Sequence, residues 1–166
     1  TSIGTGSFES CISLKNITIP NSVLTIGLWS FESCTSLKSV IIGNNVSEIK
    51  WSAFESCTSL ENIIIPESVK TIGESSFESI SNIRSITIKS NLNSIGKDAF
   101  GSMNKLNTIV YLGTTTPTCN DGIFTGSSLL NKVYANSLYS GTTFCQTTCE
   151  NTINSNGLCG EQLKYI

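Results

Sequence analysis

Phenylalanine recurs through most of this chain at steps of 23 residues, with a single step of 24 before the last member of the series. Other apolar columns keep the same step: isoleucine stands five residues before most of these phenylalanines, and aliphatic residues stand six and nine residues after them. One unit of this length cannot bury its own apolar face, whereas stacked units can. The period therefore predicts a solenoid of stacked coils. The phenylalanine column is Phe8, Phe31, Phe54, Phe77, Phe100 and Phe124.

Each unit contains one short segment with the alternation of a β-strand. The segments LKNITI, LKSVII, LENIII, IRSITI and LNTIVY share the pattern L-x-x-I-x-I, in which alternate residues point into the coil and the others face solvent. We expect these strands to stack at about 4.8 Å into one parallel β-sheet face. The chain should turn at the isoleucine column of Ile49 and return by a short helical or irregular path, because a 23-residue coil has little room for a long helix.

The consensus I-G-x-x-(A/S)-F-x-x-C-x-x-L-x-x-I-x-I-P-x-x-V resembles that of the BspA-like leucine-rich repeat family. The resemblance covers residues 1–135 and implies a leucine-rich repeat solenoid of about six repeats, the first of them partial. Residues 136–166 abandon the period and are expected to form a cysteine-containing C-terminal cap, since the last coil has no following neighbour. Members of the family are typically cell-surface or secreted proteins of bacteria and protists that are associated with adhesion.

Composition excludes several classes of function. The chain has no histidine, so Ser-His and Cys-His catalytic pairs are impossible, and we expect no enzyme and no cofactor. The formal charge is -2 and 13% of residues are charged, which leaves no basic surface for nucleic acid. No apolar run approaches the roughly 18 to 20 residues of a bilayer span, so we expect no membrane insertion within this segment.

The seven cysteines form two sets. Cys11, Cys34 and Cys57 share one column and are expected to be buried free thiols, because stacked side chains at about 4.8 Å suit a disulfide poorly. The other four lie in a tail with little apolar content, where two disulfides would supply order, with free thiols or a four-thiolate zinc site as alternatives. Four cysteines allow three pairings. These candidates are Cys119, Cys145, Cys149 and Cys159.

A column of glutamates follows the phenylalanines, at Glu9, Glu32, Glu55 and Glu78. Such a ladder could recruit calcium, but exposed carboxylates that extend into screened solvent need no metal ion. A catalytic carboxylate pair requires two unlike environments, and a repeated column makes them alike. We therefore expect a solvated ladder and no metal site.

The outward column of the predicted sheet is the candidate binding surface. Lined-up aliphatic residues on an exposed face suit a protein partner, although β-branched residues also favour strands for their own sake. The face should measure roughly 300 to 400 Å², against about 800 Å² per partner in a standard interface. We expect weak binding that is strengthened by many copies. The candidate residues are Thr18, Ile41, Ile64, Thr87, Val110 and Tyr134.

Two functions follow from this surface. The family resemblance implies a protein-binding module of a cell-surface or secreted adhesin, which would contact a host or matrix protein. The alternative is a cytoplasmic scaffold that binds other copies of itself. Two sequons, at Asn45 and Asn16, are glycosylation candidates and would be used only on a secretory route in a eukaryote.

Overall fold

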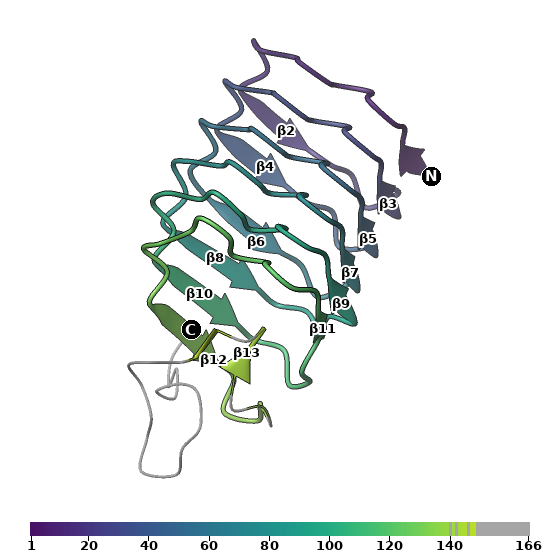
Figure 1. Cartoon of the computed structure of the whole chain (residues 1–166). Coiled ribbons are helices and arrows are strands. Elements are labelled where there is room, and N and C mark those ends of the chain that lie inside the picture. Colours follow the sequence, from purple (N-terminus) through teal and green to yellow (C-terminus); the bar gives the residue numbers. More distant parts are fainter. Residues whose placement is uncertain (140, 142, 146, 149–166) are drawn as a thin grey trace.

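The computed structural model describes residues 1–139, 141, 143–145 and 147–148. The chain winds into a stack of coils that begins with residues 2–3 at one end and reaches residues 132–135 at the other (Figure 1). The described residues contain no helix, so of the two expected return paths, helical or irregular, the chain adopts the irregular one. Among the described residues there is also no helix long and apolar enough to cross a membrane. The solenoid expected from the 23-residue period is confirmed.

One face of the stack is built from the L-x-x-I-x-I segments, as expected (Figure 1). With one interruption, between residues 39–41 and 63–65, neighbouring strands are parallel and pair at an offset of 23 residues, or 24 at the last step: Ile63 lies opposite Ile86, and Ile109 opposite Val133. In each strand the alternate isoleucines or valines enter the core. The strands of this face, called the main sheet below, are β2 (Asn16–Thr18), β4 (Ser39–Ile41), β6 (Ile63–Ile65), β8 (Ser85–Ile88), β10 (Thr108–Tyr111) and β12 (Lys132–Ala135).

A second parallel sheet occupies the place where we expected only a turn. Its six strands are two residues long and centre on the isoleucine column, and Cys119 takes the isoleucine position in the last one. A glycine follows most of these strands because neighbouring backbones approach closely there; a Cβ on Gly73 would lie 2.7 Å from the backbone at Lys50. The strands are β1 (Ser2–Ile3), β3 (Thr25–Ile26), β5 (Glu48–Ile49), β7 (Thr71–Ile72), β9 (Ser94–Ile95) and β11 (Thr118–Cys119).

The core between the sheets is a set of ladders of like side chains. The rings of Phe31 and Phe54 stack with centroids 5.1 Å apart and planes 2° apart, and the spacing widens to 5.9 Å between Phe100 and Phe124. Phe31, Phe54, Phe77 and Phe100 are fully buried. Apolar burial of this kind is the main stabilising contribution to the fold.

The return segment is made of turns that hydrogen-bond from coil to coil. Two residues per coil have positive φ, and the second of them is a serine in every coil except the last, which has Gly126. This conformation directs an N–H toward the next coil: Ser33 N donates to Glu55 O over 2.9 Å, and Ser56 N to Glu78 O over 2.9 Å. The serine column is Ser10, Ser33, Ser56, Ser79 and Ser102, with φ between 54° and 61°.

The last coil is covered by an aromatic cluster and a disulfide. Cys119 is bonded to Cys145, which ties the described part of the tail to the second sheet. The buried ring of Phe144 lies 4.7 Å from that of Tyr111 between ring centroids, and Tyr139 packs on Tyr111 edge to face. A short antiparallel pair, β13 (Thr143–Phe144) and β14 (Thr147–Thr148), follows. The other two disulfide candidates, Cys149 and Cys159, lie outside the described residues.

Candidate functional site

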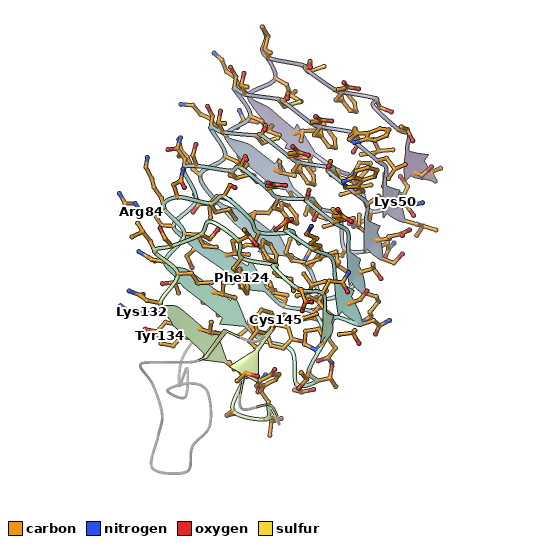
Figure 2. The ribbon with its side chains drawn as sticks, in the orientation of Figure 1. Lys50, Arg84, Phe124, Lys132, Tyr134 and Cys145 are labelled. Carbon is orange, nitrogen blue, oxygen red and sulfur yellow. A yellow bond between two sulfur atoms is a disulfide. The ribbon has the colours of Figure 1, made fainter. Side chains whose placement is uncertain are left out.

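The outward column of the main sheet is unevenly exposed. Ile41 and Ile64 are 60% and 53% exposed, which is unusual for large aliphatic side chains in neighbouring strands. Thr18 is also exposed, whereas Thr87, Val110 and Tyr134 are half-buried. The structure therefore places all six candidates on one face and concentrates the accessible apolar surface at β4 and β6. Figure 2 shows Tyr134 at the far end of this face, near Lys132 and on the same edge as Arg84.

The main sheet is interrupted at the same place. Elsewhere its neighbouring strands pair over three or four residues, but between β4 and β6 the ladder is reduced to an isolated bridge between Ser39 and Asn62, the residue before β6. Pro66 directly follows β6 and has no N–H to extend the ladder. A groove of about 660 Å³ lies over these two strands, and we call it the β4–β6 groove. Its lining includes Ile41, Ile64, Asn44, Asn62, Glu67 and Lys89.

The β4–β6 groove combines an apolar wall with a polar rim. Ile41 and Ile64 supply the wall, and the side chains of Asn44 and Asn62 lie beside them. Glu67 and Lys89 bring charges of opposite sign. In the described part of the chain the two ion pairs are Lys50 with Glu48 and Lys97 with Asp98, so neither rim charge is neutralised by a side-chain partner.

The loop beside the groove is held by amide side chains. Asn44 N donates to Asn21 Oδ1 over 2.7 Å, and Asn45 Nδ2 donates to Asn21 O over 2.8 Å. Both sequon asparagines, Asn45 and Asn16, are exposed. Asn45 Nδ2 carries two hydrogen atoms, and a glycan would replace one of them, either the one donated to Asn21 O or the other.

The glutamate ladder lies on the return side. Partial burial raises the pKa of Glu32, and the neighbouring carboxylates of Glu55 and Glu9 raise it further. No group of three or more metal-ligating side chains is found among the described residues. The ladder is thus a row of mutually repelling carboxylates.

The cysteine column lies in the core beside the phenylalanine ladder. Cys34 and Cys57 are fully buried, Cys11 is half-buried, and all three are free thiols, as expected. Cys34 Sγ donates to Phe8 O over 3.0 Å and Cys57 Sγ to Phe31 O over 3.1 Å. The adjacent sulfur of Cys34 and burial both raise the pKa of Cys57, which keeps that thiol protonated.

Two features of the surface were missed from the sequence. The β4–β6 groove depends on how neighbouring strands separate, and its one available signal was Pro66 after a strand of three isoleucines. The other feature is a pair of tryptophans on the return side, Trp29 and Trp51, whose ring centroids are 5.4 Å apart. The signal for this pair was two large aromatic residues in adjoining columns of successive units.

Sequence comparison decides the family. The profile of the BspA type leucine rich repeat region matches six copies across residues 1–131. The chain belongs to the BspA-type leucine-rich repeat family. The resemblance expected from the repeat consensus is thereby confirmed. Among curated proteins, none matches the chain.

Solved structures of bacterial leucine-rich repeat proteins share this fold. A leucine rich repeat protein of T. pallidum is 28% identical with a TM-score of 0.69, over 80% of this chain and 62% of its own. One from Bacteroides ovatus is 31% identical, also with a TM-score of 0.69, over 81% of this chain and 34% of its own. A leucine rich cell surface protein of Faecalibacterium prausnitzii, 24% identical, matches with a TM-score of 0.58 over 81% and 42%. The chain thus spans less than two thirds of each of these proteins.

Proposed function

We propose that this BspA-type chain is a non-catalytic protein-binding module of a cell-surface or secreted adhesin. The observation that carries the proposal is the exposure of Ile41 and Ile64 together, side by side on an otherwise regular sheet. Aligned apolar side chains on a surface are typical of sites that bind protein. The partner would be a host or matrix protein, and Thr18, Thr87, Val110 and Tyr134 would form the rest of the contact.

Two further observations support a location outside the cytoplasm. The Cys119–Cys145 disulfide suits an oxidising compartment. A structurally similar protein of Faecalibacterium prausnitzii is described as a leucine rich cell surface protein. A cytoplasmic scaffold would keep its thiols reduced, so the redox state of the native protein separates it from the adhesin.

The exposed sheet face is small, and this limits the affinity of a single copy. A standard interface takes about 800 Å² from each partner, which is more than six strands of three or four residues present on one side. We therefore expect weak binding by one chain and strong binding by arrays of chains, because linked copies rebind locally.

The proposal is tested by placing charge on the two isoleucines. Beads that carry many copies of the chain are applied to a surface coated with extracellular-matrix extract. The fraction of beads retained is compared between wild type and the double variant Ile41→Asp with Ile64→Asp. We expect at least tenfold weaker retention, because two buried carboxylates would be desolvated in the contact. The matched control is Ile12→Asp, which charges an isoleucine of similar exposure, 62%, outside the main sheet. Equal retention by the folded double variant would refute the site.

A further inference from the structure

Three irregularities coincide at a single place in an otherwise periodic molecule. The main sheet loses its regular pairing between β4 and β6, its two most exposed aliphatic residues stand on those strands, and the β4–β6 groove opens there. The same columns pair fully between β8 and β10, so the departure belongs to this one pair of coils and is not imposed by the repeat. The groove is thus the point at which this surface can discriminate between partners.

The size of the groove suits a short segment of a partner. Its volume of about 660 Å³ lies within the roughly 300 to 1,000 Å³ that is usual for ligand sites. A larger globular surface could cover the groove but could not fill it. A segment that enters it must be extended and must project from its parent protein.

The lining distinguishes between classes of ligand. It contains no aromatic side chain, which a sugar ring would need for stacking. It carries one carboxylate, on Glu67, and one ammonium, on Lys89, so neither an anionic polymer nor a lipid tail matches it. A polypeptide satisfies every part: aliphatic side chains for Ile41 and Ile64, backbone amides for Asn44 and Asn62, and charges of both signs for the rim.

We infer that the β4–β6 groove binds an extended peptide segment with two closely spaced aliphatic side chains and, on one side of them, one basic and one acidic residue. The inference rests on the proposed function, since it names the part of the partner that the binding face selects. The basic residue of the peptide pairs with Glu67 and the acidic residue with Lys89. Rim charges of this kind set orientation and specificity more than affinity.

A random library of 12-residue peptides displayed on phage, selected against the whole chain, tests the inference. We expect enriched peptides to share the aliphatic pair together with two charges of opposite sign on one side of it. Fluorescence anisotropy of a synthetic consensus peptide should show at least tenfold weaker binding to Ile41→Asp and to Ile64→Asp, and unchanged binding to Ile12→Asp. No enrichment, or binding that survives both substitutions, would overturn the inference.

The rim charges allow a sharper version of the test. The double variant Glu67→Lys with Lys89→Glu keeps the net charge but reverses the order of the two rim charges. It should bind the consensus peptide several-fold more weakly, and a peptide with its two charges exchanged should recover the loss. Equal binding of both peptides to both proteins would contradict the assigned orientation and with it the inferred ligand.

Failure of this inference and failure of the proposed function give different results. If matrix retention depends on Ile41 and Ile64 while no peptide is enriched, the binding face stands and the groove inference falls. If peptides bind in the groove while matrix extract is not retained, the groove inference stands and the adhesin proposal falls.

Discussion

The column three residues after the phenylalanines holds apolar residues, such as Ile80 and Met103, as well as small hydrogen-bond donors. Cys57 Sγ donates to Phe31 O, and Ser127 Oγ donates to Phe100 O over 2.7 Å from the equivalent position. Both side chains are small enough for the space beside the phenylalanine ladder and both carry a donor. The hydrogen bond is therefore compatible with this column but not required by it, since Ile80 and Met103 fill the same place in later coils and are fully buried.

The glutamate ladder makes a prediction that depends on pH. Because the pKa of Glu32 is raised in the folded chain, the folded state is penalised once the pH rises through that pKa. Glu32→Gln should therefore stabilise the chain at pH 7 by up to about 0.5 kcal/mol, a small value because the side chain is largely solvated. The gain should vanish at pH 3, where the carboxyl is protonated. Urea unfolding at the two pH values measures it.

Glu78→Gln is the matched control for that variant. Glu78 ends the ladder, because the next coil has Gly101 at the equivalent position, so it has one glutamate neighbour in place of two. Its replacement should stabilise the chain by less. A gain for Glu32→Gln that is equally large at pH 3 would show that carboxylate ionisation is not its cause.

The elements differ in how clearly the sequence announces them. The main sheet was predictable because its strands alternate over enough residues for the pattern to be visible, and the phenylalanine, isoleucine and leucine columns identified its core side. The second sheet was not, since a strand of two residues has no detectable alternation and the glycine after Ile72 suggests a turn. These short strands form because stacking aligns the backbones of neighbouring coils. The sequence of a single unit carries no sign of that alignment.

The candidate site divides in the same way. The column containing Ile41 and Ile64 could be assigned to the outer face from alternation alone. Two further features could not be read from alternation: Ile41 and Ile64 are more exposed than Val110, and the β4–β6 groove lies between them. Both accompany a local loss of pairing between two coils. Pairing of this kind is a property of neighbouring backbones, so side-chain pattern alone does not reveal it.

The turns of the return segment make a prediction about backbone conformation. Ser56 has a φ of 57°, a region that costs a residue with a Cβ atom roughly 1 kcal/mol and that glycine adopts freely. Ser56→Gly should therefore raise the free energy of unfolding by up to about 0.5 kcal/mol. Ser56→Val should lower it by about 1 kcal/mol, since β-branched residues tolerate this region poorly. Denaturant titration distinguishes the two signs.

An extended serine is the control for the glycine substitution. Ser85 begins β8 and is exposed, so Ser85→Gly should destabilise the chain through the greater flexibility that glycine gives the unfolded state. If both glycine variants changed stability in the same direction, backbone conformation at Ser56 would not be the reason for the serine column.

Over the whole molecule, stability depends on contacts between neighbouring coils. Each coil packs on one coil before it and one after it, so the free energy of unfolding is close to a sum of coil and interface contributions. The ends of such a stack need cover, and the described part of the tail supplies it with Phe144, Tyr139 and the Cys119–Cys145 bond.

This dependence predicts unequal losses from one substitution made at two places. The ring of Phe54 stacks on Phe31 and on Phe77, with centroids 5.1 and 5.4 Å apart, so Phe54→Ala opens a cavity in two interfaces and should cost about 3 to 5 kcal/mol. Phe8 is half-buried and stacks only on Phe31 within the described chain, so Phe8→Ala should cost roughly half as much. Urea titration followed by native-state hydrogen exchange measures both losses.

Hydrogen exchange also shows where the damage lies. In Phe54→Ala the amides that join the central coils, such as Phe54 N to Ser76 O, should exchange faster than those near the covered end, because the interfaces next to the cavity open first. In Phe8→Ala the increase should be confined to the first coils, and Ile41 and Ile64 should keep their binding. Equal losses and uniform exchange in the two variants would mean that the chain unfolds as one cooperative unit, and that stability at the β4–β6 groove is set by every coil in the stack.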